Sequence, residues 1–252
     1  MQELAVAGSH WSFIDTGGKT KDARVPLILL PGSVGTCEVF FKQVAALGAD
    51  GRIIAATYPA LADPEDLADG LAAFMTELEL DRAHVLGSSF AGYWIQYAAL
   101  RHPERIETLV LGNTFLEPGG LLANPLFAPD LILQGSAGEL QRVWLERAES
   151  GPDSELRTLQ IDMLSGRQDA ETLRSRLVGV VQARPCPEAE FPRERIVIID
   201  CDDDPIITPF MRRAVRARYA GARAYALRTG GHYPHILNPG DYNAVLRVLL
   251  TG

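Results

Sequence analysis

The stretch VLGSSFAGYW, residues 85–94, joins an apolar run to a helical pattern through a series of small residues. Its pentapeptide GSSFA, residues 87–91, fits the pattern Gly-x-Ser-x-Gly/Ala with Ser89 at the centre. In a sharp turn from a strand into a helix, the residues two positions before and after the central one approach closely, so both must be small. Ser88 lacks such neighbours. The stretch therefore predicts a strained turn that exposes Ser89 as a nucleophile, and a helix N-cap serine is the structural alternative.

Apolar runs and helical patterns alternate on both sides of this turn. The runs are short and continuously apolar, as is typical of central parallel strands that are covered on both faces. Alternation of strands and helices predicts an α/β fold with a mostly parallel sheet and helices on both faces. Residues 10–18 are expected to form an additional, antiparallel strand. The other predicted strands are 27–30, 52–57, 83–87, 108–113, 195–200 and 222–227, and the predicted core helices include 63–80 and 90–103.

Residues 116–192 break this alternation. They contain no strand-like run, and their apolar residues recur at intervals of three and four, which is typical of amphipathic helices. The predicted organisation is a core of residues 1–115 and 193–252, with residues 116–192 inserted as a helical cap over the edge of the sheet. The cap helices are expected within 137–150, 153–165 and 169–183.

The composition argues against several classes of protein. The 252 residues suit one large α/β domain or one domain with an inserted subdomain, and 47% of them are hydrophobic, enough for a sizeable core. A formal net charge of −8 without a basic cluster argues against binding to nucleic acid or to an anionic membrane surface. No apolar stretch reaches the ~18 residues of a membrane span. The start of the chain lacks the pattern of a signal peptide.

Three cysteines, Cys37, Cys186 and Cys201, are widely spaced along the chain. An odd number at such spacings predicts neither a disulfide framework nor a set of zinc ligands. Together with the absence of a signal-peptide pattern, this favours a cytoplasmic location.

A nucleophilic serine needs a general base, because its hydroxyl is not ionised at neutral pH. The motif TGGHYPHILNPG, residues 229–240, follows the last predicted strand and supplies two histidines. Its two glycines free the backbone that presents His232, whereas His235 lies beside a proline and is expected in the first turn of the final helix. We therefore expect His232 to be the base. The alternative is that both histidines are surface loop residues.

The base in turn needs a carboxylate that orients its ring. The motif DCDDDPIITP, residues 200–209, follows a predicted strand and offers four aspartates. An aspartate near position 204 would complete the chain order Ser…Asp…His that is typical of α/β-hydrolases. A solvated acidic loop or a divalent metal site is the alternative interpretation. A metal would need further ligands from elsewhere, and none is evident, so no metal and no other cofactor is expected.

Two backbone N–H groups are expected to stabilise an oxyanion. One belongs to Phe90, which directly follows the predicted nucleophile at a helix N-terminus, where the helix dipole favours negative charge. The other belongs to the turn PGSVG, residues 31–35, which follows an early strand. Ser33 is the expected donor, because Pro31 has no N–H. Two such donors would complete an oxyanion hole.

These motifs resemble the α/β-hydrolase superfamily over nearly the whole chain. The resemblance implies Ser89 as the nucleophile, Ser33 and Phe90 as oxyanion donors, and residues 116–192 as a helical cap. Within the superfamily the chain is similar to the maspardin group, most clearly over residues 26–118. The stretches that carry this similarity are PLILLPGSVGTCEVFFKQVAALG (26–48), LGSSFAGYWIQYAA (86–99), LVLGNTFLEP (109–118) and LRTGGHYPHIL (227–237).

The resemblance also bears on the acid and the base. The common Asp-Pro pattern of the superfamily, aligned on DDPIIT (203–208), selects Asp204, whereas the maspardin pattern selects Asp203; we prefer Asp204. Animal maspardins carry asparagine at the position of His232, which has encouraged a non-catalytic, protein-binding view of them. This chain keeps the histidine. Its oxyanion turn begins Pro-Gly, as in maspardins, where most of the superfamily has His-Gly.

The leading hypothesis is a carboxylesterase-like serine hydrolase that cleaves an ester, thioester or related acyl bond of a small molecule through an acyl-enzyme. His232 would deprotonate Ser89, and an aspartate would hold the imidazole. The acyl pocket is expected to include Val34, Phe115 and Ile206, which lie near predicted strand ends. Two alternatives remain open. One is a catalytically silent, maspardin-like interaction module, and the other is a lyase or cyclase on the same fold.

Overall fold

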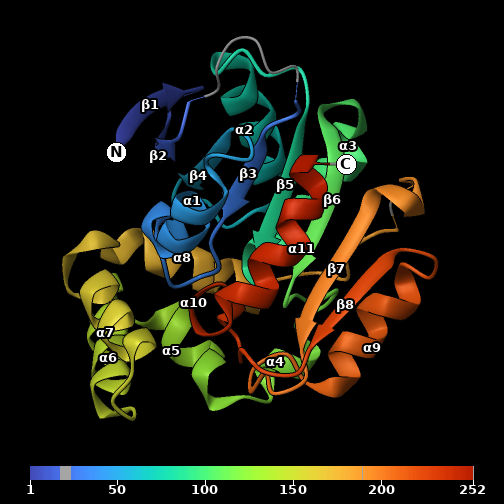
Figure 1. Cartoon of the computed structure of the whole chain (residues 1–252). Helices are drawn as coiled ribbons and strands as arrows, with labels where there is room; N and C mark the ends of the chain where they lie inside the picture. Colours follow the sequence, from blue (N-terminus) through green and yellow to red (C-terminus); the bar gives the residue numbers. More distant parts are fainter. Residues whose placement is uncertain (18–23, 189, 252) are drawn as a thin grey trace.

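The apolar runs of the sequence form one eight-stranded sheet (Figure 1). The computed structural model describes residues 1–17, 24–188 and 190–251, and the strand order within them is β1-β2-β4-β3-β5-β6-β7-β8. The β1–β2 and β2–β4 pairs are antiparallel, and the strands from β4 to β8 run parallel. The strands are β1 Gln2–Val6, β2 Ser9–Asp15, β3 Leu27–Leu30, β4 Ile53–Thr57, β5 Ala83–Ser88, β6 Ile106–Gly112, β7 Ile196–Cys201 and β8 Arg223–Leu227.

The α/β fold class predicted from the sequence is confirmed, and the six predicted core strands are present within two residues at each end. The strand expected at 10–18 is the antiparallel β2; its last predicted residue, Gly18, lies outside the described residues. β1 was not predicted, because its residues are mostly exposed and form no apolar run. It pairs with β2 across a tight turn at Ala7 and Gly8, whose φ angles are 48° and 79°.

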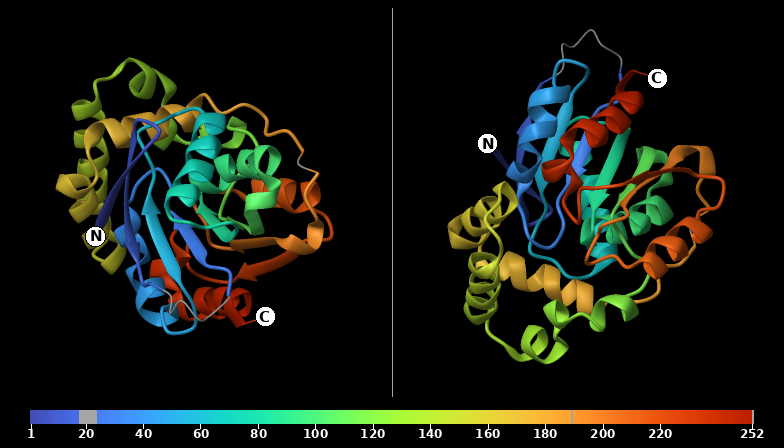
Figure 2. Two further views of the ribbon diagram at one scale, coloured as in Figure 1. Left: turned by 90° about the horizontal axis from the view of Figure 1, so that it is seen from above. Right: turned by 60° about the horizontal axis from the view of Figure 1, so that its bottom comes forward.

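Helices cover both faces of the sheet (Figure 2). In β3, Leu27 and Leu29 belong to a buried cluster that includes residues of α1 and α11, while Ile28 and Leu30 belong to a second cluster that includes residues of α2, α3 and α9. Burial on both faces explains why the parallel strands are continuously apolar rather than alternating. The helices are α1 Phe41–Leu47, α2 Pro64–Glu77, α3 Phe90–Arg101, α4 Gly119–Leu122, α5 Pro129–Gln134, α6 Ala137–Ser150, α7 Glu155–Asp162, α8 Ala170–Val181, α9 Pro209–Arg218, α10 Pro234–Leu237 and α11 Pro239–Thr251.

The segment between β6 and β7, residues 113–195, is called the β6–β7 connection below. It contains α4 to α8, and its described residues include no strand. Figures 1 and 2 show these helices gathered at the end of the sheet where the parallel strands finish. Each long helix begins at a side-chain N-cap, Ser136 for α6, Ser154 for α7 and Asp169 for α8, which satisfies an otherwise free backbone N–H. The helix expected at 153–165 changes to a π-helical turn from Met163.

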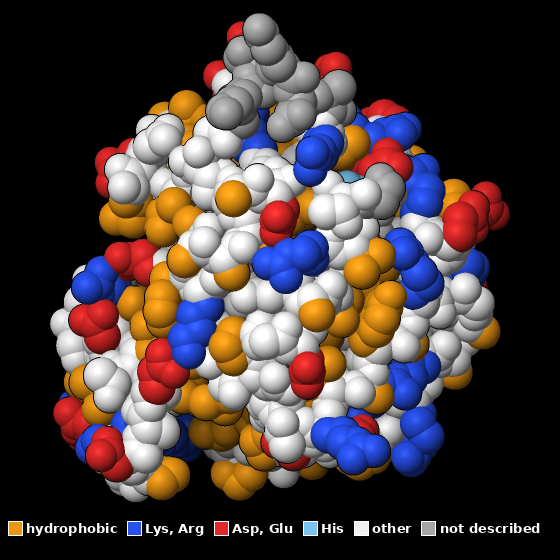
Figure 3. Space-filling view, in the orientation of Figure 1, with side chains coloured by type: hydrophobic (Ala, Val, Ile, Leu, Met, Phe, Trp, Pro, Cys, Tyr) orange, Lys and Arg blue, Asp and Glu red, His pale blue; other side chains and the backbone are white. Residues whose placement is uncertain are grey.

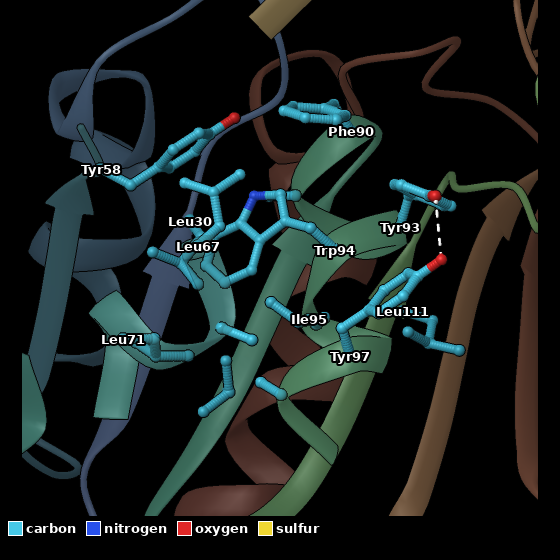
Figure 4. Packing of buried hydrophobic residues seen from close by; sticks show 14 of the residues in the cluster. Leu30, Tyr58, Leu67, Leu71, Phe90, Tyr93, Trp94, Ile95, Tyr97 and Leu111 are labelled. Atoms are coloured by element: carbon cyan, nitrogen blue, oxygen red, sulfur yellow. Dashed lines mark hydrogen bonds between the residues drawn. The ribbon is translucent and has the colours of Figure 1, made fainter. Parts of the chain in front are cut away.

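Helix α3 follows the turn that carries Ser89 and is packed in the hydrophobic core (Figure 4). Ten of its twelve residues are buried, so it is apolar on nearly every side. Trp94 packs edge-on against Tyr58, with ring centroids 5.2 Å apart, and the hydroxyl groups of Tyr93 and Tyr97 lie 3.2 Å apart in a hydrogen bond. A helix that is buried to this extent leaves little freedom to the residue at its N-terminus.

The surface agrees with the charge pattern of the sequence. On the face shown in Figure 3, acidic and basic side chains are interspersed, and no continuous basic stripe crosses it. None of the helices in the described ranges is both long and apolar enough to cross a membrane. All three cysteines are buried and unpaired.

Candidate active site

Ser89 lies in the turn between β5 and α3, with φ 54° and ψ −116°. This conformation is rarely populated by residues with a side chain and costs about 1–3 kcal/mol. A Cβ on Gly87 would lie 2.5 Å from the backbone of Ala91, and a Cβ on Gly92 would lie 2.7 Å from the carbonyl oxygen of Gly87. The small residues around Ser89 are therefore required by the close approach of the strand and the helix.

Ser89, His232 and Asp204 form one chain of hydrogen bonds. The Oγ of Ser89 lies 2.9 Å from Nε2 of His232, and Nδ1 of the same ring lies 2.9 Å from Oδ2 of Asp204. The three residues follow β5, β8 and β7, whose carboxyl ends lie at one edge of the sheet. The geometry suits transfer of the serine proton to the imidazole, with the other ring N–H donated to the carboxylate.

The Asp204 carboxylate is buried and accepts more than one hydrogen bond. Its Oδ1 accepts the backbone N–H groups of Ile206 at 2.7 Å and Ile207 at 3.0 Å. Burial raises the pKa of Asp204, but the charge and hydrogen bond of His232 and the two N–H donors outweigh it and hold the pKa below its usual value. Asp204 is therefore ionised at neutral pH and faces the imidazole as an anion.

Asp203 occupies a different place. Its carboxylate accepts the backbone N–H groups of Gly230 at 3.2 Å and Gly231 at 2.8 Å. These glycines immediately precede His232, and both have positive φ angles, 138° and 55°. The structure thus places Asp204 against the imidazole and Asp203 against the backbone of the loop that presents it.

Residues at the end of β6 connect the parts of this edge. The Asn113 amide donates to the carbonyl of Gly231 at 2.9 Å, and its Oδ1 accepts the N–H of Cys201 at 3.0 Å. The Thr114 hydroxyl donates to the carbonyl of Ser89 at 2.7 Å. The nucleophile turn, the acid strand and the histidine loop are therefore held by two adjacent residues.

The turn after β3, residues 31–35, lies against Ser89. A Cβ on Gly32 would lie 3.0 Å from the Cβ of Ser89. Within the described residues, no group accepts a hydrogen bond from the backbone N–H of Ser33 or of Phe90. Both expected oxyanion donors are thus free of protein acceptors in the described part of the chain.

The side-chain amide of Gln168, in the β6–β7 connection, makes two hydrogen bonds with the backbone of this turn. Its Nε2 donates to the carbonyl of Ser33 at 2.7 Å, and its Oε1 accepts the N–H of Gly35 at 2.8 Å. The side chain is buried, so these two bonds are not exposed to competition from solvent. A single side chain therefore fixes the backbone on both sides of Val34.

Arg176 of α8 holds the same turn from a fully buried position. Its Nη1 donates to the carbonyls of Gly35 at 2.7 Å and Gly32 at 3.1 Å, and its Nη2 donates to the carbonyl of Tyr58 at 3.2 Å. The guanidinium carbon lies 3.8 Å from the centroid of the Tyr58 ring. Burial lowers the pKa of Arg176, yet arginine stays charged in proteins. The turn is therefore bound by a buried cation.

These contacts act on the peptide groups that carry the expected donors. The carbonyl of Gly32 and the N–H of Ser33 belong to one peptide group, and Arg176 binds that carbonyl. A hydrogen bond to the oxygen of a peptide group polarises its N–H and strengthens it as a donor. The β6–β7 connection thus fixes the direction and increases the donor strength of the Ser33 N–H.

A cavity of about 230 Å³ opens beside Ser89 and His232. Val34 and Ile206 line it, but Phe115 does not. The expectation for Phe115 was wrong because its ring turns into the core and stacks on Tyr93, with centroids 5.0 Å apart. The residues lining the cavity are Gly32, Ser33, Val34, Ser88, Ser89, Leu126, Phe127, Trp144, Arg147, Ala148, Gln160, Leu164, Ile206, His232 and Tyr233.

Several residues that hold the site were missed from the sequence. Gln168 lies between two of the expected cap helices, 135 positions after Ser33, and Arg176 lies within one of them, 144 positions after Gly32. Neither context indicated a contact with the turn. Asn113 is the last residue of the predicted strand 108–113, a place where polar residues often serve a site, and that signal was available.

The fold and this site define the class of protein. The chain belongs to the alpha/beta hydrolase family, whose model matches residues 27–245. It is similar to maspardin from Homo sapiens, with 28% identity over 246 residues, 95% of this chain and 79% of that protein. It is also similar to the putative carbamate hydrolase RutD from Caulobacter sp. strain K31, with 24% identity over 253 residues and 94% of each chain. These matches confirm the resemblance noted from the motifs.

A solved structure shares the same fold. The enol-lactonase from Burkholderia xenovorans LB400 superposes with a TM-score of 0.78 over the full length of both chains, at 20% identity. At this identity the likeness shows the architecture alone, so the chemistry must be argued from the side chains of this protein.

Proposed function

We propose that this protein is a serine hydrolase that cleaves an ester, thioester or related acyl bond of a small molecule. The observation that carries the proposal is the chain from Ser89 through His232 to Asp204, with 2.9 Å at each link. A hydroxyl, an imidazole and a buried carboxylate in this order generate a nucleophile at neutral pH. One similar protein is named a putative carbamate hydrolase, and that similarity supports hydrolysis as the reaction.

The reaction proceeds through an acyl-enzyme in two halves. His232 Nε2 takes the proton of Ser89 as Oγ attacks the acyl carbon, and it gives that proton to the leaving group as the acyl bond breaks. Water then attacks the acyl-enzyme, its proton passes to His232, and Ser89 Oγ leaves and regains the proton. One water is consumed, and an acid and the leaving group are released. Asp204 remains ionised throughout and holds the imidazole in the required tautomer.

The N–H groups of Ser33 and Phe90 receive the oxyanion in both halves. Preorganised donors are effective because they need no rearrangement when charge develops. Gln168 and Arg176 supply that preorganisation for the Ser33 side of the hole, by the contacts described above.

The β6–β7 connection acts as the cap of the site. In this division residues 1–115 and 193–252 form the catalytic core, and residues 116–192 form the cap. The lining of the cavity supports it, since the core contributes Val34 and Ile206 and the connection contributes Leu126, Phe127 and Trp144. A cap of apolar side chains would exclude water from the acyl group until the second half of the reaction.

The similarity to maspardin favours a second candidate, an interaction module on the same fold. In an interaction module, the strained backbone at Ser89 and the alignment of the His232 ring with Ser89 would serve no function. Such strain is nevertheless costly to maintain. A lyase or cyclase would use the same residues without net consumption of water. Incorporation of oxygen from labelled water into the acid product separates hydrolysis from that chemistry.

The direct test of the proposal is covalent labelling with a fluorophosphonate probe. We expect one adduct per chain, located on the peptide that contains Ser89, and no adduct on the folded Ser89→Ala variant. Ser88→Ala is the matched control and should label at the wild-type rate or within a few-fold of it. Absence of labelling of folded wild-type protein, or equal labelling of the Ser89→Ala variant, would overturn the proposal.

A further inference from the structure

The cavity beside Ser89 carries one cation and no anion on its walls. Among its lining residues in the described part of the chain, Arg147 is the only lysine or arginine, and none is aspartate or glutamate. Gln160 and Tyr233 add further groups that can donate hydrogen bonds, while much of the remaining wall is apolar. Such a lining favours a ligand that carries negative charge at one end and apolar carbon between that end and Ser89.

Arg147 is held only loosely by the protein itself. Its guanidinium donates to the carbonyls of Leu126 at 3.5 Å and Pro125 at 3.4 Å, both long contacts. It lies 5.9 Å from the ring of Trp144. The indole N–H of that tryptophan is buried and has no acceptor among the described residues. Arg147 and Trp144 both line the cavity, and both carry N–H donors for which the described residues supply no close acceptor.

The absence of a carboxylate near Arg147 distinguishes it from other arginines of the β6–β7 connection. Five of those arginines lie within 4.0 Å of an aspartate or glutamate, whereas Arg147 has no such partner among the described residues. Arg174, Arg176 and Arg195 also lack one, but they donate to backbone carbonyls and do not line the cavity. The five paired arginines are Arg142, Arg157, Arg167, Arg184 and Arg193.

We propose that Arg147 binds a carboxylate of the substrate, so that the enzyme acts on acyl groups that carry a second, free carboxylate at the far end. The inference rests on the proposed function and names the substrate class of the same site. A guanidinium matches a carboxylate with two parallel N–H bonds, which fixes the orientation of the ligand as well as its charge. The scissile acyl carbon then lies at Ser89, with the apolar part of the chain against Leu126, Phe127 and Leu164. Hydrolysis of such a substrate consumes one water and releases a dicarboxylic acid and the leaving group.

The test compares two substrates that differ in one charge. 4-Nitrophenyl hydrogen adipate has a free carboxylate, and methyl 4-nitrophenyl adipate has the same chain without the charge. For the wild-type protein we expect kcat/KM to favour the anionic ester by at least about tenfold. Arg147→Gln should lower kcat/KM for the anionic ester by about 10- to 100-fold, mainly through KM, and should change the neutral ester by less than about threefold. Arg174→Gln is the matched control and should change neither substrate.

Each result of the kinetic test has a defined meaning. Equal preference for the two esters by the wild-type protein, or an equal loss on both in the Arg147→Gln variant, overturns the assignment of Arg147. If neither ester is hydrolysed and the fluorophosphonate does not label Ser89, the proposed function itself fails.

Binding keeps the inference testable in that case too. In a Ser89→Ala background, monomethyl adipate should bind by calorimetry at least tenfold more tightly than dimethyl adipate. Addition of Arg147→Gln should remove the difference, while Arg174→Gln should preserve it. If the two ligands bind equally in the Ser89→Ala background, the proposed subsite is absent.

Discussion

The carboxyl edge of the sheet and the β6–β7 connection both reach the nucleophile, but they contribute different kinds of groups. The edge provides the side chains that we propose to react, since Ser89, Asp204 and His232 each follow a parallel strand and form one chain of hydrogen bonds. The connection provides side chains that bind backbone, since Gln168 and Arg176 both bind the turn that carries the proposed oxyanion donor. The chemistry is therefore fixed by strand ends, whereas the electrostatic environment of the transition state depends on a segment far away in sequence.

The largest expected effect separates two neighbours at the sheet edge. Asp204→Asn should lower kcat by about 10³- to 10⁴-fold, because an amide at this position no longer fixes the tautomer or balances the imidazolium. Asp203→Asn should cost about tenfold or less, because that side chain binds the backbone before His232 rather than the ring. Steady-state kinetics with any ester that the wild-type protein hydrolyses would measure kcat of both variants. The reverse order of effects would assign Asp203 as the acid and contradict the account of this edge.

The next effect tests the contribution of the connection. Arg176→Met should lower kcat/KM by about 10- to 100-fold, since the Ser33 N–H loses both its direction and its polarisation. The loss should fall on kcat more than on KM, and the affinity for a boronic acid that mimics the tetrahedral intermediate should fall in parallel. The Arg176→Lys variant should retain part of the activity that the Arg176→Met variant loses.

Arg174→Met, two residues away on α8, is the control for a general disturbance of the helix. A drop in thermal stability with unchanged boronic acid affinity would reduce Arg176 to a structural role. That result would show that the β6–β7 connection does not tune the Ser33 N–H.

A third prediction concerns the contact between the two regions. A Cβ on Gly179 of α8 would lie 2.4 Å from Cζ of Phe90, the residue that follows the nucleophile. Gly179→Ala should therefore destabilise the protein by about 1–3 kcal/mol. Gly138→Ala is the matched control, because a Cβ there meets no atom within 4 Å and α6 gains helix propensity. Urea unfolding measures both variants, and equal stability of the two would show that α8 does not pack tightly on the turn.

The smallest expected effect is a pH dependence of the free energy of unfolding, which arises from two buried histidines. Burial lowers the pKa of His84 to about 4 and, together with the nearby His232, lowers the pKa of His235 to about 3. Because both values lie below the ordinary value of about 6.5, the unfolded chain takes up these protons first, and stability falls as the pH drops below about 6.5. Between pH 7 and 5.5 the loss should be about 1 kcal/mol per histidine.

Unfolding curves at several pH values check this prediction. The double variant His84→Val with His235→Phe should show a flatter dependence, while the exposed His10→Asn should not. An unchanged slope in the double variant would place the acid sensitivity elsewhere, for example in the connection, which contains no histidine.

The positions of the loops at the carboxyl edge of the sheet could be predicted from the sequence because their signals are local. The small residues around Ser89 report a close contact between adjacent elements, and the glycines before His232 report positive φ angles. The order of strands then brings these loops together without further information. Only the choice between Asp203 and Asp204 needed the structure, since a shift of one residue decides which carboxylate faces the ring.

The connection could not be predicted to the same depth because its contacts are not local. A helical period predicts that α8 has a buried face, but it does not say that Arg176 is on it or that backbone carbonyls are its partners. The lining of the cavity could not be predicted for the same reason. Phe115 lies near a strand end and was expected to line the cavity, yet its ring lies in the core, where it stacks on Tyr93 of α3.

Activation of Ser89 by His232 is tested most directly by comparing the rates at which a fluorophosphonate labels the wild-type protein and the His232→Asn variant. His232 Nε2 lies 2.9 Å from the Oγ of Ser89, and asparagine cannot accept the serine proton as a base. We predict that the variant folds with wild-type secondary structure and labels at least about 10³-fold more slowly. Labelling of the folded variant at the wild-type rate would show that Ser89 is not activated by His232, and it would contradict the assignment of this site as a serine hydrolase centre.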